Sequence, residues 1–275
     1  MKLNATSSLN SVVSDGLKFQ NNGLLINGGQ LTWSGSGNNL DFNGSGTLTN
    51  LASGTITITA DVSDVGSGTI GNAGLVTKPG TTGTTTLSTA FVNTGTLNVQ
   101  SGAISLTGGY TSTKGTLAFG INGATNYGKI NLSGAAAFKG SLGVNLNGLY
   151  WPTVGSSFNL LNYGPESSVL FTNTALPPFV TWQTNYNSTA FTLTVSARPT
   201  NAARANLTMS LASNTSLSLA WPGDHTGWQL ETQTNPNNVG LSTNWVIVPG
   251  SGSTNEVTFP ISLADGSDFF RLLYQ

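Results

Sequence analysis

The sequence contains no cysteine, a single histidine and very few charged residues. The absence of cysteine excludes disulfide frameworks, thiol nucleophiles and thiolate metal sites. Charged residues make up only 7% of the 275 residues, and the formal net charge is −1. The basic residues are scattered singly, whereas nucleic acids and anionic membranes bind clustered Lys and Arg. We therefore expect no nucleic-acid partner.

Long apolar segments are absent as well. No segment approaches the length of a membrane helix, so we expect no membrane insertion. The first residues, Met1 to Ser7, lack the apolar stretch of a signal peptide. A cysteine-free, low-charge chain is compatible with an exported bacterial protein. If the protein is exported, we expect that its signal peptide is not part of this chain.

What the chain does contain is glycine, Asn, Thr, Ser and regular alternation of apolar residues. The clearest alternation runs from Ile130 to Leu146, where one parity is apolar and the other polar or small. A period of two predicts β structure with one buried face. A single strand of this length would be unusually long, so we expect bends near Gly134 and Gly140.

Internal repeats extend this pattern along the chain. Residues Leu24 to Gly35 align with residues Leu97 to Gly108, and both segments are two short alternating runs around a glycine. We interpret each pair of strands joined at a glycine corner as one rung of a β-solenoid, with Asn and Thr forming turns and stacked ladders. A β-sandwich is the alternative. Pro79 and the run from Gly80 to Thr86 are expected to leave the stack as a loop.

A resemblance supports the solenoid. The stretches Asn126 to Leu142 and Trp151 to Leu161, with Phe171, Trp182 and the alternating Ala190 to Val195, resemble the end of autotransporter passenger-like β-strand-repeat surface proteins of Verrucomicrobia-type bacteria. The resemblance covers roughly residues 87 to 196. It implies a parallel β-helix closed by a cap, in an extracellular protein.

The chain composition changes after residue 196. Residues 197–206 are poor in large apolar residues and are expected to form a linker. Beyond them, about seven short alternating runs predict a small antiparallel β-sandwich at 207–275, and these runs resemble a C-terminal fibronectin-III-like module. The predicted organisation is an all-β chain with a solenoid at 1–196, its cap at about 147–196, the linker and the sandwich.

Candidate catalytic groups are few. A Ser-His-Asp triad would have to use His225, but the sequence has no nucleophile elbow to complete it. We therefore expect His225 to be an exposed loop residue. Seven acids could supply a glycosidase pair, but the four aspartates among them are expected to shape turns instead. These acids are Asp61, Asp64, Asp265, Asp268, Glu166, Glu231 and Glu256. We therefore predict a non-enzymatic protein with no catalytic residues, no metal site and no cofactor.

Aromatic residues offer the best case for binding, because exposed rings stack on sugars. The predicted carbohydrate-binding tyrosines are Tyr110, Tyr127, Tyr150, Tyr163 and Tyr186. Trp151 and Trp182 are expected to plug the end of the solenoid, and Trp221, Trp228 and Trp245 to lie in the sandwich core.

These observations lead to two functional hypotheses. The first is a structural or adhesive extracellular protein, in which a β-helix stalk presents polar Asn, Thr and Ser faces to surface glycans or to other copies of itself. In this reading, Leu9 to Phe19 could add a strand to a neighbouring copy and build a filament. The alternative is a secreted carbohydrate-binding or carbohydrate-active protein with a lyase-like or glycosidase-like function.

Overall fold

A computed structural model describes most of the chain. The described residues are 2–3, 11–13, 17–20, 22–35, 38–112, 114–147, 150, 152–165, 167–177, 180–198, 201, 203–261 and 266–274. They divide into two compact units, one of residues 1–147, 156–176 and 183–194, the other of residues 148–155, 177–182 and 195–275. No helix in these ranges is long and apolar enough to cross a membrane.

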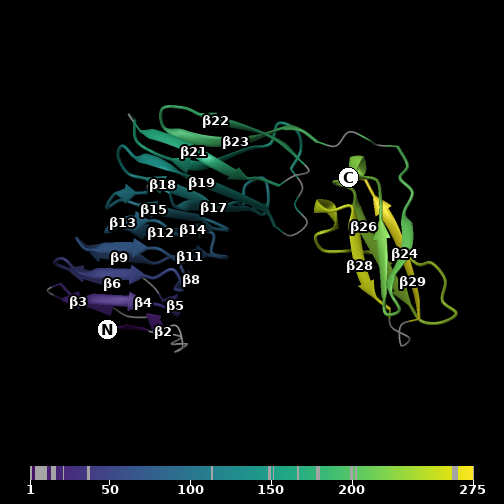
Figure 1. The fold of residues 1–275 in the computed structure, drawn as a ribbon, viewed down its shortest axis with the longest axis horizontal. Coiled ribbons are helices and arrows are strands. Elements are labelled where there is room, and N and C mark those ends of the chain that lie inside the picture. Colours follow the sequence, from purple (N-terminus) through teal and green to yellow (C-terminus); the bar gives the residue numbers. More distant parts are fainter. Residues whose placement is uncertain are drawn as a thin grey trace. The chain divides into compact units, whose positions relative to one another are not determined.

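The first unit is a parallel β-solenoid built from three sheets (Figure 1). Sheet A contains β1 (Lys2–Leu3), β4 (Leu24–Asn27), β7 (Thr47–Asn50), β10 (Thr69–Asn72), β13 (Ala90–Asn93) and β16 (Tyr110–Thr111). Sheet B contains β2 (Ser11–Val13), β5 (Gln30–Trp33), β8 (Thr55–Ile58), β11 (Leu75–Lys78), β14 (Thr96–Val99), β17 (Thr116–Ile121), β19 (Ala137–Leu146) and β21 (Ser168–Ala175). Sheet C contains β3 (Leu17–Gln20), β6 (Asn38–Asn43), β9 (Ser63–Gly66), β12 (Thr84–Leu87), β15 (Ala103–Leu106), β18 (Lys129–Leu132), β20 (Ser157–Asn162), β23 (Ala190–Ala197) and β22 (Thr181–Tyr186).

Each turn of the solenoid passes once through each sheet, so one rung contains three strands rather than the two that the repeats predict. The sequence repeat is real but lies on different faces. Leu24 to Gly35 spans the corner from sheet A to sheet B, whereas Leu97 to Gly108 spans the corner from sheet B to sheet C. The repeat therefore describes a strand pair with its corner, which occurs at more than one corner of a turn.

Alternation along each strand builds the core. Register pairing places one inward side chain directly above another, as in Leu48, Ile70 and Phe91 of sheet A. All three are at most 2% exposed. At ~25 cal/mol per Å² of apolar surface, such stacked columns are the main source of the folding free energy.

The long alternation at Ile130 to Leu146 follows the predicted pattern, with one difference. The chain turns at Gly134, which has a φ of 77°. Gly140 lies inside β19, where the pairing with β21 shifts between Gly140 and Ser141. Gly140 stacks on Gly115 at the corner between sheets A and B, so β19 crosses that corner at the expected bend. The inward parity of Phe138 and Leu142 is maintained.

The excursion predicted at Pro79 to Thr86 is shorter than expected. Thr84 to Leu87 form β12, which pairs with β15 in the third sheet. Thr85 points into the solenoid and is fully buried. A threonine methyl group fills the inward position, while its hydroxyl donates to the Ala60 carbonyl at 3.4 Å. Threonine can therefore serve in a column that the sequence pattern assigns to apolar residues.

The corner between sheets A and B is closed by a ladder of buried asparagines. Asn27, Asn50, Asn72 and Asn93 end successive strands of sheet A and are at most 2% exposed. In each step, the Nδ2 group of one asparagine donates to the Oδ1 atom of the next at 2.8 Å. We name this set the asparagine ladder. It confirms the expectation that Asn side chains stack near the corners.

The amides also bind the backbone beyond the corner. Asn50 Nδ2 donates to the carbonyls of Gly54 and Leu75, and Asn72 Nδ2 donates to the Thr96 carbonyl at 3.0 Å. A glycine comes after each of these asparagines because successive corners stack in direct contact. A Cβ atom at Gly95, for example, would collide with the Gly74 carbonyl. The corner motif thus combines a buried asparagine with a glycine one or a few residues later.

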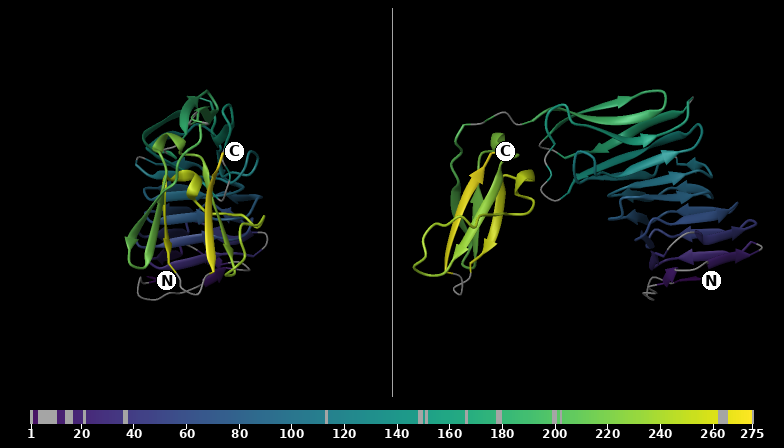
Figure 2. Two further views of the ribbon diagram at one scale, coloured as in Figure 1. Left: turned by 90° about the vertical axis from the view of Figure 1, so that its right-hand side faces the viewer. Right: turned by 180° about the vertical axis from the view of Figure 1, so that it is seen from behind.

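An aromatic column leads to the far end of the solenoid. Phe138, Phe171 and Phe191 pack in sequence, with ring centroids 5.0 and 4.9 Å apart. The strand β23 pairs antiparallel with β20, which ends the parallel series in sheet C. Figure 2 shows the green strands at this end of the solenoid, stacked next to the teal turns. Trp182 is half-buried, with its indole donating to the Pro177 carbonyl at 3.2 Å, and Trp151 lies outside the described residues.

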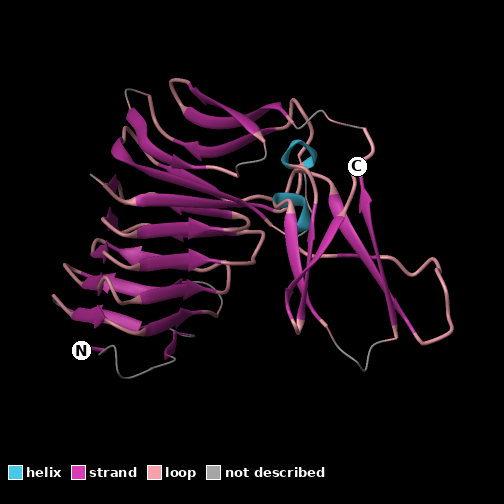
Figure 3. Ribbon diagram, turned by 45° about the vertical axis from the view of Figure 1, so that its right-hand side comes forward, coloured by secondary structure: helices cyan, strands magenta, loops and turns pink. Residues whose placement is uncertain are grey.

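The second unit contains two antiparallel three-stranded sheets, visible in Figure 3 with two short 3-10 helices. They are β24 (Thr208–Ser213), β25 (Ser216–Ala220) and β28 (Glu256–Pro260), and β27 (Val246–Ile247), β26 (Gln229–Asn235) and β29 (Ser267–Leu273), with η1 (Gly223–His225) and η2 (Ser251–Ser253). Leu219, Trp221 and Leu230 join both sheets in one hydrophobic core. Of the three tryptophans expected in this core, Trp221 lies in it, and Trp228 is buried against His225 instead. Trp245 is half-buried, with the Arg271 guanidinium 4.2 Å from its ring.

Replacing Asn50, which has a ladder neighbour on each side, tests how much the asparagine ladder contributes to stability. We expect Asn50→Ala to lower the free energy of unfolding by about 2–4 kcal/mol, because it leaves buried partners unsatisfied on both sides. Asn50→Asp keeps the shape but replaces the donor with a buried charge, and is expected to cost at least as much at neutral pH.

The matched control is Asn98→Ala, which removes a half-buried asparagine bonded to Thr77 on the outer side of sheet B. We expect it to cost less than about 1 kcal/mol. Urea unfolding followed by circular dichroism measures all three variants. If Asn50→Ala and Asn98→Ala lowered the free energy of unfolding equally, the ladder would stabilise the fold no more than a half-buried outer asparagine does.

Candidate binding groove

A groove lies on the outer side of sheet C, beside the corner that leads from sheet B. Its volume is about 470 Å³, within the range of ~300–1,000 Å³ typical of small-molecule sites. The groove is lined by Thr82, Thr84, Gly102, Ala103, Thr125, Asn126, Tyr127, Lys129 and Asn131. Hydroxyl and amide groups dominate, with one aromatic ring and one ammonium group.

Strand register builds the floor. Thr84 of β12 pairs with Ala103 of β15, which in turn pairs with Lys129 of β18. Neighbouring strands are ~4.8 Å apart, so these three side chains form one row across three turns. The small Ala103 side chain in the middle of the row leaves the space that the groove occupies.

The wall comes from the segment between β17 and β18. Asn122 donates its backbone N–H to the Asn126 carbonyl at 2.9 Å, and Gly128 donates to the Gly120 carbonyl at 2.8 Å. A Cβ atom at Gly128 would collide with the Val99 carbonyl. Gly128 therefore allows the chain to pass against the solenoid, and this close packing holds Tyr127 in place.

Tyr127 and Lys129 act together at the groove. The Lys129 ammonium lies 4.5 Å from the centroid of the Tyr127 ring, an arrangement that attracts the charge to the ring face. The edge-to-face contact between Tyr127 and Phe158, at 5.3 Å, anchors the ring to the core. Among the predicted tyrosines, Tyr127 lines this groove. Lys129 was not among the predicted site residues, although it follows Tyr127 by two positions.

Two of the predicted tyrosines do not have the exposed ring that sugar stacking requires. Tyr110 is 9% exposed, and its hydroxyl accepts a hydrogen bond from Asn93 at 3.2 Å, at the end of the asparagine ladder. Tyr163 is also buried and donates to the Ala190 carbonyl at 2.7 Å. Their roles in the structure are to satisfy buried polar groups.

The remaining two tyrosines are half-buried. The Tyr186 ring packs on Phe191 at 4.8 Å, and its hydroxyl accepts from the Phe171 N–H at 3.3 Å. Tyr150 does not line the groove. The five tyrosines therefore do not form one common surface, and the groove retains Tyr127 from the predicted set.

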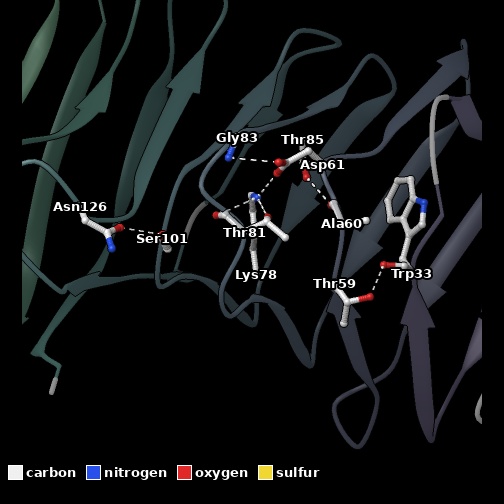
Figure 4. Close-up of polar contacts among 10 residues, drawn as sticks. All are labelled: Trp33, Thr59, Ala60, Asp61, Lys78, Thr81, Gly83, Thr85, Ser101 and Asn126. Carbon is white, nitrogen blue, oxygen red and sulfur yellow. Dashed lines mark hydrogen bonds and ion pairs between the residues drawn. The ribbon is translucent and has the colours of Figure 1, made fainter.

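A buried lysine lies at the same corner, nearer the N-terminus (Figure 4). Lys78 is the last residue of β11 and occupies an inward position, which apolar residues hold in the neighbouring strands of the sheet. Its side chain is fully buried. Its ammonium contacts Asp61 Oδ1 at 2.6 Å and also binds the Thr81 hydroxyl. The other oxygen of Asp61 accepts from the Gly83 N–H at 3.1 Å.

The environment of Asp61 favours its ionised form. Desolvation acts in the opposite direction, but the hydrogen bonds from Lys78 and Thr81, together with the lysine charge, outweigh it. The pKa of the Asp61 carboxyl is therefore lowered from its ordinary value of 3.8. Asp61 serves as the counter-ion of a buried cation, a larger role than the turn formation expected from the sequence.

Asp64 fastens the third corner, between sheets C and A. It is 3% exposed, and its two oxygens accept hydrogen bonds from the hydroxyls of Ser88 at 2.7 Å and Thr89 at 2.5 Å. The backbone N–H groups of the same two residues also donate to it. Asp61 and Asp64 thus stabilise different corners of the solenoid.

His225 is buried rather than exposed as predicted. It is 4% exposed, its Nε2 atom lies 2.9 Å from the Ala203 carbonyl, and its ring packs on Trp228 at 5.2 Å. The sequence places it in a turn between strands, but the chain before β24 covers that turn. A hydrogen-bonded, covered imidazole is a structural group of the second unit.

The other candidate acids are engaged in pairwise contacts. Glu231 binds Arg271 at 2.6 Å, Glu256 accepts from Ser218 at 2.5 Å, and Asp268 accepts from Thr234 at 2.6 Å. Asp265 and Glu166 lie outside the described residues. Within the described part of the chain, no group of three or more His, Asp or Glu side chains could hold a metal ion.

The fold and its contacts define a three-sheet parallel β-solenoid followed by small antiparallel sheets. Compared with family models and with curated proteins, the sequence matches none of them. The solenoid class therefore follows from the strand register and the stacked corners alone.

The ion pair between Lys78 and Asp61 generates an asymmetric prediction. Asp61→Ala leaves a buried ammonium without its counter-ion and is expected to cost about 1–3 kcal/mol, since the carboxylate side of the pair is 39% exposed. Lys78→Met fills the apolar column and is expected to be nearly neutral. Asp61→Ala combined with Lys78→Met should recover most of the loss, as measured by urea unfolding.

The pH dependence has a definite sign. Because the folded-state pKa of Asp61 is lowered from 3.8, its contribution is present above that value and is lost as the pH falls through the folded-state pKa. Lys78→Met should therefore flatten the acid limb of the stability profile. An unchanged acid limb in Lys78→Met would contradict this assignment.

Tyr110 generates a prediction at alkaline pH. Burial raises the pKa of its phenol from 10.0 to about 12, although hydrogen bonds from Asn93 and Ser112 lower it in part. The contribution of the neutral phenol is present below pH 10 and is lost as the pH rises towards 12. Absorbance titration at alkaline pH should show a late-ionising tyrosine that is absent in Tyr110→Phe; titration of all tyrosines near pH 10 would refute this.

Proposed function

We propose that this chain is a non-enzymatic structural or adhesive protein of the bacterial cell surface, in which a β-solenoid stalk presents polar Thr, Asn and Ser faces. The observation that carries this proposal is the use of the buried polar groups. The inward-facing asparagines, Asp64 and Lys78 bind partners within the stalk and close its corners. These side chains make the stalk stiff and are not arranged around a reactive centre.

The outer faces differ from the interior in composition and suit multivalent contacts. Register stacks Thr47 on Thr69 in sheet A and Thr57 on Thr77 in sheet B, so hydroxyl groups repeat from turn to turn. A repeated face contacts a surface at several points, and the total affinity then exceeds that of one contact. An adhesive role requires only such repetition and a rigid support.

A carbohydrate-binding function is the second candidate, and the groove beside Tyr127 favours it. A glycosidase places two carboxyl groups about the scissile bond, whereas the lining residues of the groove include no Asp or Glu within the described part of the chain. The groove thus supports binding of a glycan more than its cleavage. A lyase-like activity, which uses a basic group as proton acceptor, is a possible outcome of the assay below.

Self-assembly is a further form of the structural proposal. Among the described residues, Ser11–Val13 and Leu17–Gln20 form β2 and β3, the terminal strands of sheets B and C, and each pairs with one neighbouring strand. A terminal strand can receive another strand by backbone hydrogen bonding. Negative-stain electron microscopy of the purified chain should show fibres if copies add in this way, and monodisperse particles would exclude the filament form.

Two assays on the same preparation test the proposal as a whole. A glycan array measures binding, and a reducing-sugar assay, read together with absorbance for unsaturated products, measures turnover on the glycans that bind. We expect binding or fibre formation without turnover. Turnover that is lost in Lys129→Met would replace the non-enzymatic proposal with a carbohydrate-active one.

A further inference from the structure

We propose that the groove beside Tyr127 is a binding site for an anionic sugar, carboxylated or sulfated, with Lys129 binding the anionic group. This inference rests on the adhesive form of the proposed function and adds to it a defined site and a ligand class. The site comprises the Thr84, Ala103 and Lys129 row as its floor and the Thr125 to Tyr127 segment as its wall.

The lining matches the chemistry of a sugar ring. Thr82, Thr84 and Thr125 each supply a hydroxyl that donates and accepts, and Asn126 and Asn131 supply amide groups. A sugar presents hydroxyl groups around a small apolar ring, so it needs several such partners within one shallow space. The groove has a volume of about 470 Å³, which suits a short segment of a glycan better than the flat surface of a protein partner.

The polar groups are held before any ligand arrives. Asn126 Oδ1 accepts from the Ser101 hydroxyl at 2.8 Å, and Ser101 itself is buried. Asn131 Oδ1 accepts from Asn162 Nδ2 at 2.7 Å, so the Nδ2 group of Asn131 points away from Asn162. Fixed partners lower the entropy lost on binding, so a shallow site can still bind measurably.

The charge of the groove selects an anion. Lys129 is the charged residue among the lining residues, and within the described residues it makes no ion pair. The corner carboxylate nearer the N-terminus, Asp61, accepts from Gly83 beside Thr82 and is already paired with Lys78. The ammonium at the groove is therefore uncompensated, and a carboxylate or sulfate on the ligand would supply its partner.

Tyr127 acts on the ligand through Lys129. The 4.5 Å contact places the ammonium over the ring, and the Phe158 contact keeps the ring from turning away. Tyr127→Leu removes this positioning while leaving the charge. We expect it to weaken binding less than Lys129→Met does, because the ammonium remains available in a less defined position.

The experiment uses the full chain and two matched probes. Oligogalacturonate carries a carboxylate on every ring, and its methyl ester has the same backbone without the charge. In calorimetric titrations we expect the acid form to bind at least about tenfold more tightly than the ester, and this difference to shrink at high salt.

Matched lysine variants locate the site. Lys129→Met should weaken binding of the acid form at least about tenfold, whereas Lys139→Met, which removes an exposed lysine of β19 outside the groove, should leave it unchanged. Dextran sulfate and neutral dextran form the second pair of probes. Sulfate-only binding that depends on Lys129 would support the site and assign sulfate as its anion.

The two proposals fail in different ways. If acid and neutral forms bind equally, or if Lys129→Met and Lys139→Met behave alike, the groove assignment is overturned while the adhesive function stands. If neither probe pair nor any glycan on the array binds, the groove assignment and the adhesive form both fall. A structural stalk then remains, and electron microscopy tests it independently.

Discussion

The rest of the solenoid depends on satisfying amide groups at a corner that excludes water. Asn27, Asn50 and Asn72 are buried at the corner between sheets A and B, and each donates to the asparagine of the next turn at 2.8 Å. A buried amide without a partner costs several kcal/mol. No turn can therefore close this corner alone, and the amide chemistry makes stacking obligatory where hydrophobic burial only makes it favourable. The constraint also sets the register, since a shift along the strand would separate the amides.

The same principle recurs at the other corners with different side chains. Asp64 binds Ser88 and Thr89 between sheets C and A, and Lys78 binds Asp61 between sheets B and C. Because inward-facing side chains close the corners, the side chains on the outer faces are not needed to hold the turns together. Turns can then vary in length outward, as the segment that carries Tyr127 does, without disturbing the core. The proposed binding site is of this kind, a local addition on a scaffold whose stability comes from elsewhere.

The sequence predicts the repeating part of this architecture better than its particulars. Alternation around Phe138 and the turn at Gly134 were predicted, because inward parity and glycine geometry are local properties. The three-strand turn was not, since similar strand pairs occur at different corners and the pattern does not say which sheet each joins. Burial of His225 and Tyr110 depends on segments distant in sequence, so a local reading could not find it. The groove was reached only through Tyr127; the pairing of Thr84 with Ala103 and of Ala103 with Lys129 requires the register.

Hydrogen exchange of the asparagine side chains tests the central claim most directly. Solution NMR resolves side-chain amide protons and measures their exchange with deuterated solvent one residue at a time. The ladder predicts that the Nδ2 protons of Asn50 and Asn72 exchange as slowly as the backbone amides of the surrounding strands, because both require the stack to open. Outer-face amides such as Asn98 should exchange far faster. Fast exchange at Asn50 and Asn72 while the backbone stays protected would contradict the account, since the corners would then be closed without the ladder.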